Sequence, residues 1–144
     1  MRADPILDAF AHLVRRDAHA PLVASPRASA SRGEVDALAT VIASRLGSTG
    51  VTPGAVVLLA AANGAGFLAA LVACRRAGLV PALCDSTAPA VERDRIARAL
   101  GAAVEVVGDD AFPRDIGTIA VRATGATARA PLGDYVKITS GTSG

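Results

Sequence analysis

AVVLLAAANGAGFLAALVACRRAGLVPALC, residues 55–84, is the stretch that decides the fold. Its first part, Ala55–Ala61, is a continuous apolar run with two adjacent valines, typical of a strand buried on both faces of a parallel sheet. Residues 64–77 predict a helix that stops at Gly78, and residues 79–84 predict a second strand. A strand, a helix and a strand in this order predict a right-handed crossover between two parallel strands.

The same stretch has no charged residue from Ala55 to Cys74, so a transmembrane helix is the alternative interpretation. A spanning helix needs about 20 consecutive, predominantly apolar residues. An asparagine and two glycines within residues 63–66 interrupt this run, and its valine-rich beginning favours a strand. We therefore expect a buried strand followed by a buried helix, and no membrane span.

Local signals before this stretch predict two helices and a short strand. Asp4 can cap a helix whose first position is a proline. Pro21–Ser25 is a candidate strand, and a polar turn is expected after it. Ser31 and Glu34 have the spacing of a capping box, which begins a second helix that is expected to end at Gly47. Apolar residues at helical spacing form the expected inward faces of the two helices: Ile6, Phe10, Leu13, Val14, Val35, Leu38, Ile42 and Leu46.

The alternation of helices and strands continues after this stretch. Thr87 and Pro89 begin a predicted helix that runs to Leu100, with Ile96 and Leu100 on its inward face. Its charged residues are expected on a solvated face with local ion pairs: Glu92, Arg93, Asp94, Arg95 and Arg98. Further strand candidates are Val104–Val107, Thr118–Arg122 and Tyr135–Thr139. The whole pattern predicts an α/β fold with a mostly parallel sheet covered on both faces.

Composition indicates one folded domain without a nucleic-acid partner. The chain has 144 residues, of which 51% are hydrophobic, so it can bury a sizeable core. Its formal charge of +2 is too small to indicate nucleic-acid binding. The two thiols, Cys74 and Cys84, come without a secretory signal pattern, so we expect no disulfide and a cytoplasmic location. No histidine lies near them, and their spacing does not predict a metal site.

The last ten residues, YVKITSGTSG, carry the most specific chemistry of the chain. An apolar run leads into a loop in which Thr139, Ser140, Thr142 and Ser143 supply hydroxyl groups. The glycines at 141 and 144 let the backbone approach a ligand closely. Successive N–H groups in such a turn form a concavity that binds anions such as the phosphates of a nucleotide. A flexible polar tail is the alternative interpretation of the same residues.

This loop, TSGTSG, resembles the Thr-Ser-Gly-(Ser/Thr)-Thr-Gly-x-Pro-Lys-Gly signature of the adenylate-forming enzymes, with Ser143 in place of the usual threonine. Residues 63–89 are similar to the family's Asn-x-x-x-Phe…Arg-Ala-Gly…Val-Pro…Asp stretch. Residues 31–38 resemble its Ser-x-x-Glu-Leu helix start, and residues 51–54 resemble the connection between these two segments. The features follow the family's order over the whole chain.

Two departures from the family pattern concern the subfamily more than the fold. Gly66 stands where the family usually carries an acidic or polar residue, and the stretch from Gly108 to Gly133 is shorter than is usual in the family.

The resemblance implies the N-terminal subdomain of the adenylate-forming enzyme fold. Residues 1–144 would be an incomplete N-terminal AMP-binding (adenylation) domain, with the C-terminal domain absent. In the implied reaction a carboxylic acid and ATP give an acyl-adenylate and pyrophosphate, and the thiol of CoA or of a carrier protein then takes the acyl group. The loop residues Thr139, Ser140, Gly141, Thr142, Ser143 and Gly144 would bind the ATP phosphates, whose charge Mg²⁺ would neutralise.

The chain stops inside this loop, before the family's Pro-Lys-Gly. A phosphate loop without the helix that follows it loses the contribution of the helix terminus to anion binding. We therefore expect the isolated 144 residues neither to adenylate a substrate nor to bind ATP tightly.

Two other interpretations remain open. Gly64-Ala65-Gly66 begins a G-x-G-x-x-A pattern between a strand and a helix, and Asp85 lies near the end of the next strand, as in a dinucleotide-binding (Rossmann-type) fragment. The purely structural interpretation of these glycines is a tight turn with close helix–sheet packing and Asn63 as the cap. The second alternative is a non-catalytic, folded interaction module.

Overall fold

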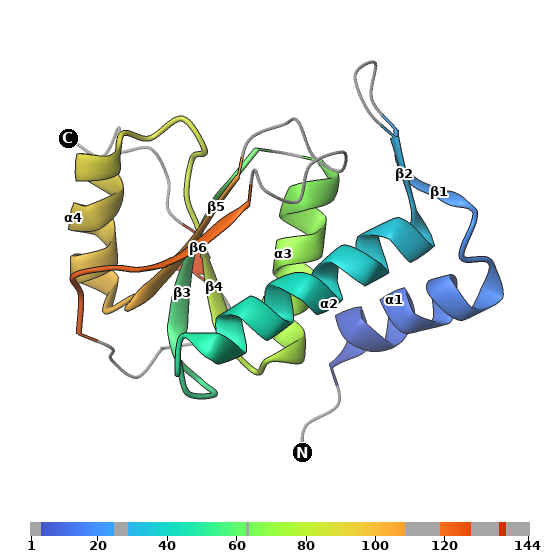
Figure 1. Ribbon diagram of the computed structural model, residues 1–144, viewed down its shortest axis with the longest axis horizontal. Coiled ribbons are helices and arrows are strands. Elements are labelled where there is room, and N and C mark those ends of the chain that lie inside the picture. The colour runs from blue at the N-terminus through green and yellow to red at the C-terminus, as the bar shows by residue number, and fades with distance from the viewer. Residues whose placement is uncertain (1–3, 25–28, 63, 109–118, 128–135, 138–144) are drawn as a thin grey trace.

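The computed structural model describes residues 4–24, 29–62, 64–108, 119–127 and 136–137. The helices in these ranges are α1 (Pro5–Arg16), α2 (Arg32–Ser48), α3 (Ala65–Arg76) and α4 (Ala90–Leu100) (Figure 1). The strands are β1 (Pro21–Ala24), β2 (Ser29–Ser31), β3 (Val56–Ala61), β4 (Val80–Leu83), β5 (Val104–Gly108), β6 (Ala120–Ala123) and β7 (Val136–Lys137). None of the described helices combines the length and the apolar character that crossing a membrane requires.

The main sheet has the strand order β6-β5-β3-β4-β7. β3 pairs in parallel with both β4 and β5, and β4 pairs in parallel with β7. The edge strand β6 runs antiparallel to β5. The predicted α/β fold with a mostly parallel sheet is therefore confirmed, and β6 is its one antiparallel member among the described strands.

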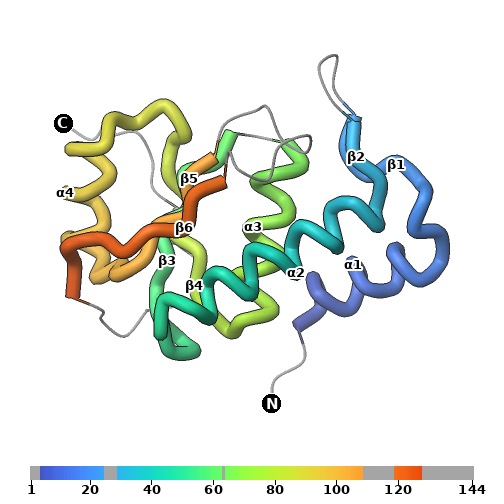
Figure 2. The backbone as a smooth tube through the Cα atoms, viewed as in Figure 1, coloured from blue at the N-terminus to red at the C-terminus, as the bar shows by residue number. Residues whose placement is uncertain are grey.

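Helices cover both faces of this sheet (Figures 1 and 2). All six residues of β3 are buried, as its continuous apolar sequence predicts. Val57 and Leu59 belong to the core shared with α2 and α3, whereas Val56 and Leu58 belong to a smaller core on the α4 side. Alternate residues of one strand thus enter two different hydrophobic cores.

The interface between α2 and α3 consists largely of small side chains. Ala39 of α2 and Ala69, Ala70 and Ala73 of α3 are all fully buried. Small residues let two helix backbones approach closely, and the larger Ile42 and Leu46 fill the space toward the sheet end of α2. A core with few aromatic residues is therefore close-packed through alanine, valine and leucine.

Two of the predicted helix starts are confirmed atom by atom. The Oδ1 of Asp4 accepts the N–H groups of Ile6 (3.0 Å) and Leu7 (3.3 Å), so Asp4 is the cap of α1. The capping box of α2 is complete, since Ser31 Oγ accepts the Glu34 N–H (3.1 Å) and Glu34 Oε1 accepts the Ser31 N–H (2.9 Å).

Three details of the N-terminal region differ from expectation. Ile6 was expected to face inward, yet it is 53% exposed, because α1 buries only Phe10 fully. The polar turn expected after β1 instead includes the short strand β2, which pairs antiparallel with β1. The helix α2 also continues through Gly47 to Ser48, and the residue with positive φ that follows it is Gly50 (φ 76°).

Candidate functional site

The strand that leads into the hydroxyl-rich loop lies directly beside β4. Ala82 is level with Val136 and Leu83 is level with Lys137, in a parallel pairing. The carboxyl ends of β4 and β7 therefore meet at the same edge of the sheet. The predicted phosphate-binding residues Thr139, Ser140, Gly141, Thr142, Ser143 and Gly144 lie outside the described residues, and their role stays a prediction.

This edge has the topology at which α/β proteins bind ligands. β3 and β4 are neighbours, yet the helices that follow them, α3 and α4, pack on opposite faces of the sheet (Figure 1). From β3 the chain crosses through α3 to β4 on one side, and from β4 it crosses through α4 to β5 on the other side of β3, so the strand order reverses between β3 and β5. In open α/β sheets ligands bind in the crevice outside the carboxyl ends of the strands at such a switch point.

The first helix at this edge, α3, begins without a side-chain cap. Its N-cap residue is Gly64, with φ 151° and ψ −157°, and no side-chain hydrogen bond is made there. The N-cap position belongs to Gly64, and Asn63, the residue expected as the cap, lies outside the described residues. Ala65 and Gly66 are buried in the first turn, where a glycine allows close packing.

The segment after β4 forms a tight, hydrogen-bonded turn. Cys84 extends the sheet by one bond, its N–H donating to Leu59 O at 2.9 Å. The Oδ1 of Asp85 then accepts both the N–H and the hydroxyl of Thr87, each at 2.8 Å, and the Ala88 N–H donates to Asp85 O at 3.1 Å. These two bonds from Thr87, the backbone one foremost, hold the pKa of Asp85 below its usual value. The turn Cys84–Ala88 is thus internally braced at the edge beside β7.

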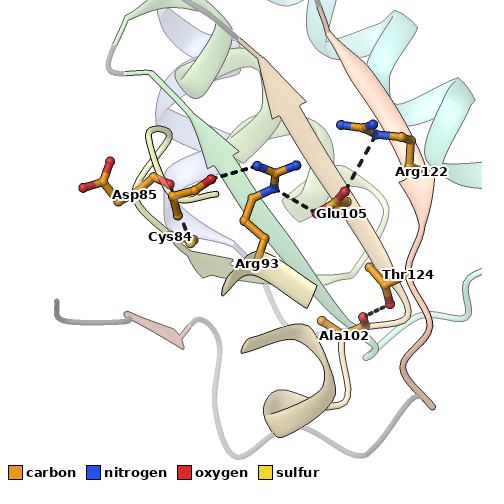
Figure 3. Close-up of polar contacts among 8 residues, drawn as sticks. Cys84, Asp85, Arg93, Ala102, Glu105, Arg122 and Thr124 are labelled. Atoms are coloured by element: carbon orange, nitrogen blue, oxygen red, sulfur yellow. Dashed lines mark hydrogen bonds and ion pairs between the residues drawn. The ribbon is translucent and has the colours of Figure 1, made fainter. Parts of the chain in front are cut away.

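An ion pair between Arg93 and Glu105 connects this turn to the sheet (Figure 3). Arg93, on the first turn of α4, donates from Nη1 to Ala88 O at 2.8 Å. Its Nε contacts Glu105 Oε2 on β5 at 3.3 Å, and the two side chains are only 11% and 13% exposed. Arg122 of β6 approaches the other carboxylate oxygen at 3.7 Å, from a side chain that is 54% exposed.

Sequence reasoning missed this arrangement. Arg93 was expected on the solvated face of its helix, and it instead lies between the helix and the sheet. The expected local ion pair is present one turn further on, between Arg98 and Asp94 at 3.2 Å. A signal was available, because Glu105 is the one charged residue in the apolar strand β5, and a carboxylate in such a strand needs a partner.

The two thiols differ in environment. Cys74 is fully buried in α3, and burial raises its pKa to about 12. Cys84 is half-buried at the sheet edge, where burial first, then the carboxylates of Glu92 and Asp85, raise its pKa. The described residues contain no cluster of three His, Cys, Asp or Glu side chains that could hold a metal ion.

Comparison with known proteins identifies the family. The sequence profile of the AMP-binding enzyme family matches residues 10–138. The MbtA apo structure from Mycobacterium smegmatis is similar, with 27% identity and a TM-score of 0.60 over 72% of this chain and 20% of that chain. A benzoate CoA ligase from Burkholderia xenovorans LB400 has 19% identity and a TM-score of 0.64, over 74% of this chain and 22% of that one. The N-terminal domain of FACL13 from Mycobacterium tuberculosis has 19% identity and a TM-score of 0.62, over 92% and 33%.

A comparison with curated proteins finds no match. The chain spans 20–33% of the length of the three similar structures. Because the family profile covers most of the chain and these structures share its fold, the chain belongs to the AMP-binding family of adenylate-forming enzymes.

Proposed function

We propose that this chain forms the N-terminal part of an AMP-binding domain that activates a carboxylic acid with ATP. The observation that carries the proposal is the match of the AMP-binding enzyme family to residues 10–138, on a fold whose switch point lies at the same carboxyl edge of the sheet as the end of β7. In the first step the substrate carboxylate attacks the α-phosphorus of ATP, which yields an acyl-adenylate and releases pyrophosphate. In the second step a thiol takes the acyl group and AMP leaves.

In this proposal the loop Thr139–Gly144 orients the β- and γ-phosphates. Its backbone N–H groups and hydroxyls donate hydrogen bonds to phosphate oxygens, and these bonds stabilise the charge that develops on the leaving pyrophosphate. The loop supplies no nucleophile, since the substrate carboxylate has that role. Mg²⁺ would be held mainly by the phosphates and by water, the usual arrangement for this ion at nucleotide sites. Residues 1–144 would be an incomplete adenylation domain, inactive without the parts of the fold that follow in the longer relatives.

The partners in this proposal are a carboxylic acid and the thiol of CoA or of a carrier protein. The similar structures include a benzoate CoA ligase and a fatty acyl-adenylate ligase, so these neighbours span both aryl and alkyl acids. The free thiols Cys74 and Cys84 suit a reducing compartment, which favours the cytoplasm as the location.

The test is acid-dependent exchange of pyrophosphate into ATP, catalysed by the product of the entire reading frame that contains these residues. A panel of aryl and alkyl acids covers the two classes. Thr142→Ala removes one hydrogen bond to a charged phosphate, which is worth about 1.5–3 kcal/mol, and should lower kcat/KM for ATP by about 10- to 150-fold. Thr127→Ala is the matched control, because Thr127 is exposed and follows β6, which lies at the opposite end of the strand order from β7.

No exchange with any acid would contradict the proposal. If the same protein instead bound NAD with micromolar affinity and lost it in Gly66→Val, the dinucleotide alternative at Gly64-Ala65-Gly66 would replace it. A cooperative melt of the product of the entire reading frame, without binding of ATP or NAD, would favour the interaction module.

A further inference from the structure

The turn Cys84–Ala88 is held by two sets of contacts that differ in range. Within the turn, Asp85 accepts the bonds from Thr87. The longer-range contact is Arg93, which reaches Ala88 O with one end of its guanidinium and Glu105 with Nε. A planar guanidinium with both sides engaged fixes the relative position of the two groups that it joins. The backbone of the turn is therefore tied to a carboxylate on another strand.

Glu105 lies in the sheet one residue level before the carboxyl end of β4. It is level with Leu58, which in turn is level with Ala82, the residue two positions before Cys84. Glu105 therefore belongs to a rigid, doubly paired part of the sheet, since β5 is bonded to β3 on one side and to β6 on the other. The pair transmits this rigidity to the turn.

The two arginines that contact Glu105 are not equivalent. Arg93 is largely buried, touches the turn and has a second hydrogen bond to it. Arg122 is more than half exposed, lies farther from the carboxylate and comes from β6, on the side away from the turn. Only the first of the two ion pairs links Glu105 to the turn, as Figure 3 shows.

We propose that the Arg93–Glu105 ion pair is a positioning element of the nucleotide site, because it fixes the turn Cys84–Ala88 at the sheet edge shared with β7. The inference rests on the proposed function for its nucleotide part. Neither residue touches the reacting atoms, and both act through the placement of the turn. Loosening the pair therefore weakens nucleotide binding without changing the groups that carry out the chemistry.

Cys84 is a natural reporter of the position of this turn. It is half-buried at the first position of the turn, while Cys74 is fully buried in α3 and reacts only when the protein unfolds globally. Glu105→Gln is the informative variant, since glutamine keeps the shape of the side chain and leaves the charge of Arg93 next to the thiol. Arg122→Gln removes the other partner of Glu105 and is the matched control.

The first readout is the rate of iodoacetamide alkylation of each cysteine, followed by mass spectrometry. Glu105→Gln should raise the rate at Cys84 about tenfold, because a charged hydrogen bond that held the turn is lost. The rate at Cys74 should stay unchanged, and Arg122→Gln should leave both rates within about twofold of wild type. Arg93→Lys keeps the charge but loses the two-sided contact, so it should also accelerate Cys84. Equal acceleration of both cysteines, or none, overturns the positioning role.

The second readout is pyrophosphate exchange by the full reading-frame product. Glu105→Gln should raise KM for ATP at least about fivefold and leave kcat within about twofold, the pattern of weakened binding with intact chemistry. An unchanged KM together with faster alkylation of Cys84 would overturn the link between the turn and the nucleotide. If the wild-type protein shows no pyrophosphate exchange, the proposed function itself is overturned. The alkylation rates test separately whether the ion pair holds the turn, so the two failures are distinguishable.

Discussion

Two glycines at the end of α2 allow one substitution to be tested with opposite expected signs. Gly47 lies in the last turn of the helix, and Gly50 lies two residues beyond its end with φ 76°. Apart from adjacent residues and the helix's own nearby backbone, a methyl group added at either position meets no atom within 4 Å. The packing term is therefore the same for Gly47→Ala and Gly50→Ala, and only the backbone conformation differs.

The magnitudes follow from this difference. Alanine is favoured over glycine inside a helix by about 0.8–1.0 kcal/mol, and by somewhat less in a terminal turn, so Gly47→Ala should raise the free energy of unfolding by about 0.5–1 kcal/mol. An alanine forced into the left-handed region costs about 1–2 kcal/mol, so Gly50→Ala should lower the free energy of unfolding by that amount. The two variants should differ by about 2 kcal/mol or slightly more.

Urea denaturation followed by circular dichroism at 222 nm measures both variants against wild type. The m-values should be unchanged, because neither substitution alters the surface exposed on unfolding. In thermal melts the midpoints should move in opposite directions, by about 3 °C per kcal/mol for a domain of this size. Equal destabilisation by the two substitutions would refute the reasoning, since it would mean that the helix does not extend through Gly47.

Three further predictions concern the core, a helix cap and acid stability. Leu59→Ala, at a fully buried position of β3, should lower the free energy of unfolding by about 3–5 kcal/mol in urea melts. Val91→Ala, where the side chain is 84% exposed, should change it by less than about 0.5 kcal/mol. Similar losses for the two variants would contradict the assigned burial. Ser31→Ala removes one half of the capping box of α2 and should lower the free energy of unfolding by about 1 kcal/mol. Ser48→Ala is the exposed control. A loss of stability no larger than that of the control would argue against the cap. Burial alone raises the pKa of Asp4, but the hydrogen bond from Arg75 (2.7 Å) and those from the Leu7 and Ile6 N–H groups outweigh burial and hold the pKa below 3.8. A depressed carboxyl pKa stabilises the fold above the unfolded-state pKa, so the advantage of wild type over Asp4→Asn should be full at pH 6 and be lost as the pH falls through the lowered pKa of Asp4. An advantage that grew in acid would show the opposite sign.

The sequence predicted features that depend on neighbouring residues better than those that depend on distant ones. The Asp4 cap, the capping box of Ser31 and the burial of β3 are set within a few residues, and all three are confirmed. The short strand β2 exists because β1 lies beside it, and nothing in Ser29–Ser31 itself signals a strand. The antiparallel direction of β6 depends on how the chain returns to the sheet, which residue patterns alone do not determine.

For the site, the sequence and the structure contribute different parts. The loop chemistry of Thr139–Gly144 comes from the sequence and stays a prediction, because the loop lies outside the described residues. Only the structure shows that β7 lies beside β4, so that the loop begins at the carboxyl edge of the sheet. The role of Arg93 also required it, because a charged residue on a helix with charged neighbours gives no sign that it turns inward.

The pairing of β3 has a consequence for the newly synthesised chain. Both of its partners in the sheet, β4 and β5, come later in the sequence. Of the described elements, α1, α2 and the β1–β2 pair precede this uncharged strand, and none of them pairs with it in the folded protein. Non-local parallel pairing forms slowly, and an unpaired apolar strand readily associates with other chains. Until residue 83 has emerged, the nascent chain depends on the cover that α2 provides, or on a chaperone, to remain monomeric.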